Sequence, residues 1–333
     1  MTDTIRILGA GPAGLAAAIV LARAGRPVQV YERRSQVGAR FHDDYQGLEN
    51  WTVRDDVLTE LQAAGIATDF RCRPFTSGRI YNPRLSRKDV KLKRPLFYLV
   101  QRGPGPNTLD TALKEQALAA GADIRFNETL PSGEADIVAT GPRGVSAIAA
   151  GLTFDTSHPD DACVVVGDSI APQGYAYLLI ANGRGTLATV LYANFDSASE
   201  CLQRSLEVFR RLLPFDMANE RSWGGYGAFR IPTTAVSGRS LLVGEAAGFQ
   251  DYLFGFGIRS AMLSGSLAAR SLLSGEDYDT LWRRRLLPTL RSGEANRRLY
   301  TTFGSFCYYG LWFLLGYFPR PDLVMRFLYN RKR

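Results

Sequence analysis

Three glycines and one glutamate near the N-terminus have the types and spacing to bind a dinucleotide. Gly9, Gly11 and Gly14 follow a short apolar stretch, and Glu32 lies 18 residues beyond Gly14. A glycine turn at a helix start lets the backbone approach a pyrophosphate, and an acid ending the next strand accepts hydrogen bonds from ribose hydroxyls. Because this acid disfavours a 2′-phosphate, FAD or NAD fits better than NADP. The residues expected at the phosphates are Gly9, Gly11, Pro12, Ala13 and Gly14.

A second stretch, GEAAGFQDYLFGFGI over residues 244–258, combines one acid with an aromatic segment. The small residues beside Glu245 would admit a flat ring against the backbone, and the apolar run before it predicts a buried strand that ends at this acid. Exposed apolar loops are costly unless a ligand covers them. The aromatic segment therefore indicates a long hydrophobic substrate or, alternatively, packing under an inserted β-sheet. Its aromatic residues are Phe249, Tyr252, Phe254 and Phe256.

Regular elements must position both stretches. Residues 4–8 and 27–31 predict strands, and the alanine-rich segment between them predicts a helix, which together form a βαβ unit. Later, a strand ending near Arg102 precedes a helix that begins near Asn107 and a further strand. Two alternating apolar runs flank Asn182-Gly183, a strong hairpin signal. With strands expected near 79–98, 163–167 and 223–229, this hairpin predicts an inserted antiparallel sheet above the ring of the dinucleotide.

Composition bounds the class of protein. The chain has 333 residues, of which 46% are hydrophobic, so we expect one or two linked domains with a large core. The four cysteines are widely scattered and have no metal-ligand spacing, so we predict no metal site and reduced thiols. No secretory signal is recognisable at the N-terminus, which favours a cytoplasmic protein.

The positive charge is concentrated at the C-terminus. Residues 281–333 hold eleven basic and two acidic residues, whereas residues 1–280 hold 29 basic and 30 acidic ones. This distribution argues against a nucleic-acid-binding face on the main body. An uncharged aromatic run over residues 299–319 approaches membrane-spanning length but is diluted by Thr, Ser, Gly and Tyr.

We therefore predict helices that lie against the cytoplasmic face of a membrane, with basic residues meeting anionic lipid. The alternative is a soluble helical cap over a substrate cavity. The basic residues concerned are Arg283–Arg285, Arg297, Arg298 and Arg331–Arg333.

Taken together, these stretches resemble the flavin-dependent monooxygenase and geranylgeranyl reductase family, which shares a glutathione-reductase-like FAD fold. The resemblance covers most of residues 1–275 and implies FAD as the cofactor. It places Glu245 on a ribityl hydroxyl, with the next helix N-terminus facing the flavin, where amides stabilise negative charge on the reduced ring. For Arg40 and Arg102 the alternative is a surface ion pair. Further cofactor contacts implied by the resemblance are Arg33, Arg40, Arg102, Gly244, Glu245, Gly255, Gly257 and Ile258.

The chain departs from the family pattern at informative positions. Glu245 replaces the family's aspartate, so one extra methylene must be accommodated. Thr140-Gly141 stands where the monooxygenases have Asp-Gly, which favours a reductase over NADPH-dependent monooxygenation. The hairpin keeps the outline of a reductase pattern, which favours an apolar substrate, although tyrosines are also ordinary strand residues. The candidate substrate residues are Tyr175, Tyr177, Tyr252, Phe254 and Phe256.

Saturation of a C=C bond requires a proton in addition to a hydride. His42 follows Arg40 closely and is a candidate proton donor, while the alternative is a histidine in a surface loop. No other residue is predicted to be catalytic.

The predicted fold class is α/β: a glutathione-reductase-like FAD-binding Rossmann domain with an inserted antiparallel β-sheet substrate domain and a helical C-terminal region. We assign residues 1–70, 102–150 and 238–280 to the FAD-binding domain, 71–101 and 151–237 to the β-sheet domain, and 281–333 to a basic, membrane-associated tail.

The expected function is FAD-dependent reduction of C=C bonds in an isoprenoid or lipid-like substrate at a membrane surface. NAD(P)H or ferredoxin would supply the electrons. The alternatives are a flavin-dependent monooxygenase of an apolar substrate and a non-catalytic lipid-binding escort on the same scaffold.

Overall fold

The computed structural model describes residues 3–53, 55–317 and 321–329, and the fold contains three sheets. The first sheet has six strands in the order β15-β16-β9-β1-β2-β8. Its strands run parallel except β15, which pairs antiparallel with β16 at one edge. The strands are β1 (Ile5–Leu8), β2 (Val28–Glu32), β8 (Asp123–Phe126), β9 (Ile137–Val138), β15 (Val236–Ser237) and β16 (Ser240–Leu242).

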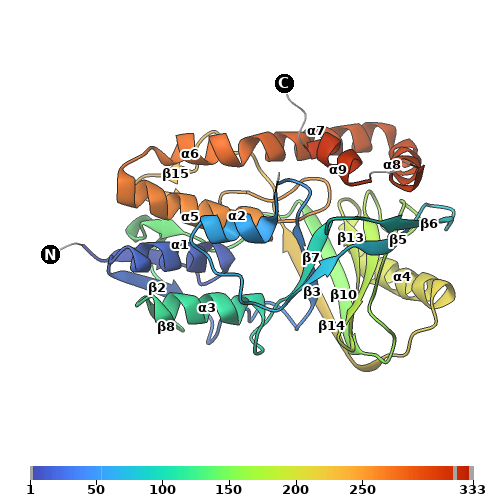
Figure 1. Cartoon of the computed structure of the whole chain (residues 1–333), viewed down its shortest axis with the longest axis horizontal. Coiled ribbons are helices and arrows are strands. Elements are labelled where there is room, and N and C mark those ends of the chain that lie inside the picture. The colour runs from blue at the N-terminus through green and yellow to red at the C-terminus, as the bar shows by residue number, and fades with distance from the viewer. Residues whose placement is uncertain (1–2, 54, 318–320, 330–333) are drawn as a thin grey trace.

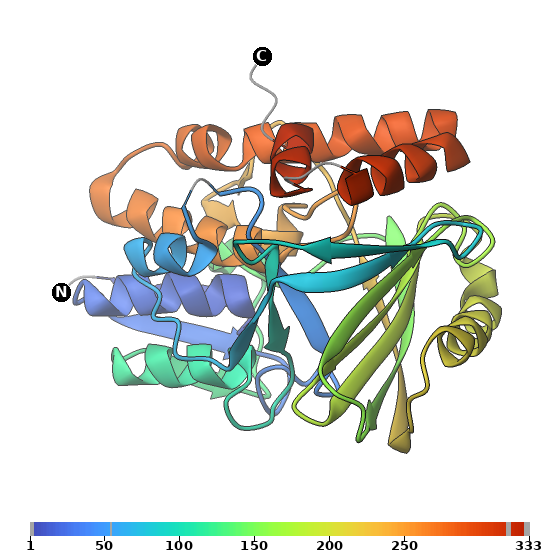
Figure 2. The ribbon, with the colours of Figure 1, turned by 45° about the vertical axis from the view of Figure 1, so that its right-hand side comes forward.

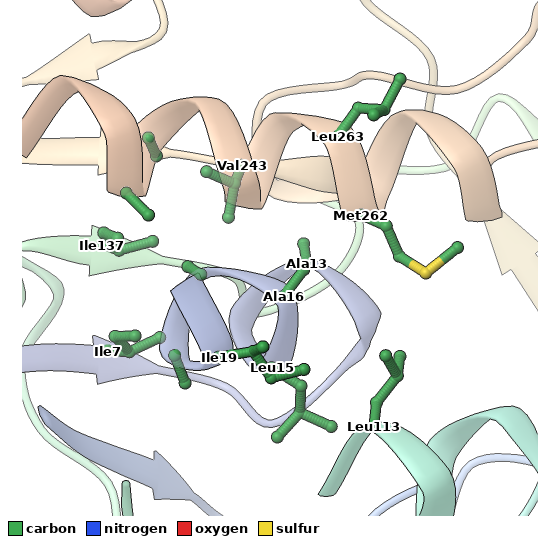
Figure 3. Packing of buried hydrophobic residues seen from close by; sticks show 14 of the residues in the cluster. Ile7, Ala13, Leu15, Ala16, Ile19, Leu113, Ile137, Val243, Met262 and Leu263 are labelled. Carbon is green, nitrogen blue, oxygen red and sulfur yellow. The ribbon is translucent and has the colours of Figure 1, made fainter. Parts of the chain in front are cut away.

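Helix α1 (Pro12–Arg23) lies at the centre of this unit. Pro12 suits the first helical position because its ring fixes a helical φ and no amide is lost there. The helix is apolar nearly all round since it packs on the first sheet and against α3 (Leu109–Ala119) and α5 (Ile258–Ser274). Figure 3 shows its Leu15 and Ile19 among side chains from these neighbours. A Cβ on Gly265 of α5 would lie 2.0 Å from the Ala13 carbonyl oxygen, so glycine permits this close approach.

The second sheet has seven strands in the order β14-β10-β13-β12-β11-β5-β6. The predicted hairpin is confirmed: β12 and β13 pair antiparallel around Asn182 and Gly183, which both have positive φ. The sheet is not wholly antiparallel, because β5 arrives from an earlier segment and pairs parallel with β11. The strands are β5 (Ser77–Tyr81), β6 (Arg87–Lys91), β10 (Ala147–Asp155), β11 (Asp161–Val166), β12 (Tyr175–Ala181), β13 (Arg184–Leu191) and β14 (Ala218–Gly227).

The two faces of the second sheet have different neighbours. Helix α4 (Ala198–Leu212) covers one face, where Phe209 packs in one core cluster with Leu178 of β12. Side chains alternate along a strand, so Tyr175 and Tyr177 project from the other face. Tyr177 there joins a cluster that includes Tyr45.

The third sheet has three strands, in the order β3-β7-β4. They are β3 (Tyr45–Glu49), β7 (Phe97–Gln101) and β4 (Cys72–Phe75). The segment 71–101, predicted to belong as a whole to the inserted sheet, thus divides between the second and third sheets. Helix α2 (Val57–Ala63) follows β3 and begins at an Asp56 cap.

In the described part of the chain, four helices follow α5: α6 (Tyr278–Arg285), α7 (Leu287–Phe303), α8 (Ser305–Tyr317) and α9 (Pro321–Tyr329). Figures 1 and 2 show them along one side of the molecule, with α8 beyond the edge of the second sheet. Within the described ranges, no helix has the length and apolar character needed to cross a bilayer. The basic end Arg331–Arg333 lies outside the described residues.

Candidate functional site

The carboxyl ends of the parallel strands bring the two glycine-rich stretches together. Gly9 follows β1, Glu32 ends β2, and Glu245 follows β16 in a short 3-10 turn, η3 (Gly244–Ala246). Since these strands are parallel neighbours or next neighbours, their ends lie at one edge of the first sheet. Ligands of open α/β sheets bind at this edge.

Each of the three N-terminal glycines is explained by a different feature of its surroundings. Gly9 has φ +105°, and a Cβ there would lie 2.5 Å from the Ala139 carbonyl oxygen. A Cβ on Gly14 would lie 2.0 Å from the carbonyl oxygen of Gly9. A Cβ on Gly11 would meet nothing within 4 Å. Gly9 and Gly14 are therefore required by packing, whereas Gly11 borders open space in front of α1.

The start of α1 and the end of β2 offer complementary polar groups to that space. No described side chain caps α1 at Gly11, and its first turn contains no acid, so its free amides keep their positive end charge. The Glu32 carboxylate accepts hydrogen bonds from the amides of Ala10 (2.9 Å) and Arg34 (3.0 Å). These bonds fix the carboxylate and leave further lone pairs for hydroxyl donors. The α1 amides fit a pyrophosphate, and the Glu32 carboxylate fits an adjoining ribose.

Arg40 and Glu245, 205 residues apart, form an ion pair. Nη1 of Arg40 lies 3.2 Å from Oε2 of Glu245, and Nη2 donates to the Tyr226 carbonyl on β14. Arg40 thus ties the first sheet to the second. Both ionic side chains are about one-quarter to one-third exposed. Arg33, in contrast, is exposed.

Arg102 also forms an ion pair, but a buried one. It is 5% exposed, and its Nε and Nη2 donate to the two carboxylate oxygens of Asp110 at 2.9 and 2.8 Å. Its guanidinium carbon lies 3.9 Å from the centre of the Phe41 ring. The expected alternative of a surface ion pair is therefore wrong for Arg102, since the guanidinium is held inside the junction after β7.

The predicted flavin-facing segment ends at an uncapped helix. Gly255 has φ +74°, Gly257 is the N-cap of α5, and no described side chain caps that helix before Ile258. Strand β3 passes close by: a Cβ on Gly47 would lie 2.3 Å from the Phe256 ring. Strand β3 therefore packs closely on the loop over residues 251–257, which we call the aromatic loop and which leads into α5.

Two of the predicted aromatic residues, Phe254 and Phe256, belong to a larger cluster. Phe254 and Phe256 surround Trp51, with ring centres 6.4 and 4.7 Å from it, and Tyr329 of α9 lies 5.9 Å from Trp51 on a further side. We call Trp51, Phe254, Phe256 and Tyr329 the aromatic cluster.

The remaining aromatic side chains lie around this cluster. Tyr175 donates to the Phe254 carbonyl, and Tyr252 packs on Phe229 at 5.5 Å. Phe249 is fully buried against Trp282. Phe249 thus belongs to the core. The segment around Phe254 contacts the second sheet through Tyr175, and α9, which the sequence analysis did not expect there, also packs against it.

One small cavity adjoins the aromatic cluster, and a larger depression lies elsewhere, at one end of the second sheet. One, of about 20 Å³, lies beside Phe256 and is lined by Glu49, Trp51, Asp251, Arg259 and Tyr329 among others. That volume holds one water molecule and no lipid chain. The other, of about 330 Å³, is a polar depression whose lining includes Asp43 and Arg184.

His42, the predicted proton donor, lies in a different environment from Glu49, an acid that the sequence analysis missed. His42 is exposed, its amide donates to Asp44 at 3.0 Å, and its carbonyl accepts from Arg184. Glu49 is 5% exposed, and burial raises its pKa to about 8. The signal available in the sequence was an acid placed between the apolar residues Leu48 and Trp51.

Comparisons with known proteins agree with this architecture. Residues 7–54 match the family model described as NAD(P)-binding Rossmann-like domain. The chain is 25% identical to a digeranylgeranylglycerophospholipid reductase from Methanosarcina acetivorans, over 84% of this chain and 80% of that protein. It is 42% identical to a hydroxysqualene dehydroxylase from Sinorhizobium fredii, over 39% of this chain and 35% of that protein.

Solved structures share the fold over nearly the whole chain. A geranylgeranyl bacteriochlorophyll reductase-like protein from Thermoplasma acidophilum superposes with a TM-score of 0.76 at 17% identity, covering 98% of this chain and 96% of that one. A probable FAD-dependent monooxygenase from Pseudomonas aeruginosa gives 0.66 at 17% identity, covering 92% and 99%.

The site's own geometry fits FAD. The open space at Gly11, the uncapped start of α1 and the fixed Glu32 carboxylate suit the adenosine diphosphate half, and the uncapped start of α5 suits a ring that gains negative charge. The chain therefore shares its fold with a geranylgeranyl bacteriochlorophyll reductase-like protein and a probable FAD-dependent monooxygenase, and over most of its length it is similar in sequence to a digeranylgeranylglycerophospholipid reductase.

Proposed function

We propose that this enzyme reduces C=C bonds of an isoprenoid or other lipid-like substrate. The observation that carries the proposal is the half-buried aromatic loop with Phe254 and Phe256, which leads directly into the uncapped start of α5. An apolar wall beside the helix end that suits a flavin favours an apolar substrate. Both curated relatives are named for compounds with isoprenoid chains, which supports the same substrate class.

In this proposal the chain holds FAD at both glycine-rich stretches. Glu32 would bind the adenosine ribose, the α1 amides the pyrophosphate, and Glu245 a ribityl hydroxyl. The pairing of Glu245 with Arg40 supports this role, because one guanidinium fixes the carboxylate position. When bound, FAD supplies hydride from its reduced ring. The contacts proposed are Gly9, Gly11, Pro12, Ala13, Gly14, Glu32, Arg33, Arg40, Arg102, Gly244, Glu245, Gly255, Gly257 and Ile258.

The chain's other residues would exclude water and hold the substrate. Phe254 and Phe256 form one wall, and Tyr175 and Tyr252 flank it. Since α9 packs on this wall, a lipid chain would have to displace part of α9 or enter beside it. We also propose that NAD(P)H or ferredoxin provides the electrons and that the C-terminal helices contact a membrane surface.

Anaerobic reoxidation of the reduced holoenzyme tests the proposed function. The dithionite-reduced, bleached protein should regain its yellow colour on addition of a polyisoprenoid alkene, with saturation of the alkene seen by mass spectrometry. Reoxidation that requires oxygen, with one oxygen atom gained by the lipid, would instead identify a monooxygenase. Protein that retains lipid but never reoxidises with it would favour the escort.

A further inference from the structure

Glu49 is a buried acid that the proposed FAD contacts do not use. It ends β3 on the same face as Gly47, which touches the Phe256 ring. Its side chain lines the cavity beside the first turn of α5, to which Arg259 and Ser260 contribute. Among the described residues, Oε2 of Glu49 has no hydrogen-bond partner. A buried carboxyl oxygen without a partner is costly, so a further group is expected to satisfy it.

Two further residues that line the same cavity also carry unsatisfied polar groups. Nε1 of Trp51 and Oγ1 of Thr52 are buried and find no partner in the described part of the chain, and both residues line the cavity. The three residues that carry these unsatisfied groups thus line one cavity of about 20 Å³, which has room for a single water molecule. We propose that Glu49 stores a proton and passes it, through one water shared with Trp51 and Thr52, to the reaction at the flavin.

Arg259, the arginine that acts on the charge of Glu49, is itself paired with another acid. Arg259 donates to both carboxylate oxygens of Glu60, at 2.5 and 2.8 Å, and Arg285 of α6 also pairs with Glu60. Burial raises the pKa of Glu49 to about 8, although Arg259 opposes the shift. A proton on Glu49 at neutral pH follows from this environment.

Asp251 is the second acid of the cavity. It accepts hydrogen bonds from the Phe254 amide at 2.6 Å and from the Tyr329 hydroxyl at 2.9 Å. Burial raises its pKa to about 6, below that of Glu49. Two acids with different proton affinities around one water suit proton transfer.

The chemical step rests on the proposed function. Saturation of one C=C bond adds a hydride to one carbon and a proton to the other. In this step the Glu49 O–H bond breaks toward the water, and the water releases a proton that forms the new C–H bond. Glu49 is left as a carboxylate and recovers its proton from solvent. Glu49 acts through the water, so it is a positioning and proton-storing residue.

Infrared spectroscopy of the full-length holoenzyme tests the proton directly. Wild-type protein should show a protonated buried carboxyl band at neutral pH that titrates with a midpoint near 8. The band should be absent from Glu49→Gln and present in Glu200→Gln, a matched change at an exposed glutamate of α4. A band that persists in Glu49→Gln, or no band in the wild type, overturns the proposal.

Thr52→Val provides a second variant if Glu49→Gln does not fold. It removes one water partner and keeps the acid, so the Glu49 band should remain but shift in frequency. An unchanged band overturns the shared water.

Reoxidation kinetics test the transfer. Glu49→Gln should slow alkene-dependent reoxidation on the order of a hundredfold, abolish the wild-type decline as pH rises through about 8, and leave flavin reduction by dithionite unchanged. An unchanged rate and pH profile overturn the relay. If wild-type enzyme bleaches but no alkene reoxidises it, the proposed function fails by itself, and the infrared titration still decides whether Glu49 stores a proton.

Discussion

At the scale of single residues, Glu32 gives the most direct test of the cofactor site. Glu32→Gln keeps a carbonyl acceptor for a backbone amide but loses the charge that strengthens hydrogen bonds to ribose hydroxyls. Charge-assisted bonds contribute about 1.5–3 kcal/mol each, so we expect FAD affinity to fall at least tenfold. Fluorescence titration of the apoprotein measures the affinity. Glu128→Gln, at an exposed position, is the control, and equal affinities in both variants would contradict the assignment of Glu32.

The raised pKa of Glu49 also predicts how the free energy of unfolding changes with pH. Its pKa in the folded state, about 8, lies above the ordinary value of 4.5. The folded state therefore binds more protons in this interval, and the free energy of unfolding falls as pH rises from about 4.5 through 8, by at most about 1.4 kcal/mol per pH unit. In Glu49→Gln this contribution is absent. Urea unfolding of both proteins across the interval should show their difference in stability shrinking or reversing toward alkaline pH. A constant difference would mean that Glu49 titrates normally.

At the scale of elements, two glycines around the start of α1 allow effects on folding and on FAD binding to be measured separately. Gly14→Ala places a Cβ against the Gly9 carbonyl oxygen, so we expect destabilisation of about 1–3 kcal/mol or more. Gly11→Ala meets no atom of the chain, and its backbone, with φ −81° and ψ 178°, is accessible to alanine. This variant should fold with nearly wild-type stability and bind FAD at least tenfold more weakly. Thermal unfolding and flavin titration measure the two effects. Normal FAD binding by Gly11→Ala would exclude the open space as the phosphate site.

The elements predicted with most success are those specified by local sequence. The βαβ unit and the hairpin at Asn182-Gly183 both form as predicted. Their signals are a glycine turn, an alanine-rich helix and two residues suited to positive φ, all within short segments. The division of residues 71–101 between two sheets could not be predicted, because β3, which recruits β7, precedes that segment by more than twenty residues.

At the scale of the whole molecule, α7–α9 present an apolar outer surface. Its exposed side chains include Phe306, at 83% exposure, and Phe313. Because isolated monomers rarely expose such patches without a partner, a lipid surface would explain it. Further exposed members are Leu299, Phe303, Leu314, Tyr317, Leu323 and Phe327.

We expect the double variant Phe306→Ser, Phe313→Ser to bind anionic phospholipid vesicles at least tenfold more weakly, since each phenylalanine contributes about 1.5–3 kcal/mol on full burial. Vesicle flotation measures binding, and Leu118→Ser, on exposed α3 surface, is the control. Flotation equal to wild type in the double variant would leave the membrane contact without support.

The sequence by itself determined the dinucleotide unit, because the turn, helix and acid of that unit lie within thirty consecutive residues and interact through neighbouring backbone. It also indicated the second glycine-rich stretch and the helical C-terminus. Tertiary structure alone decided which charges meet. Arg40 finds Glu245, Arg102 is buried with Asp110, and Glu49 faces a cavity closed by Asp251 and Tyr329. The physical reason is that burial and ion pairing depend on the packing of distant segments. Local sequence does not determine the distance between two side chains that lie far apart in the chain.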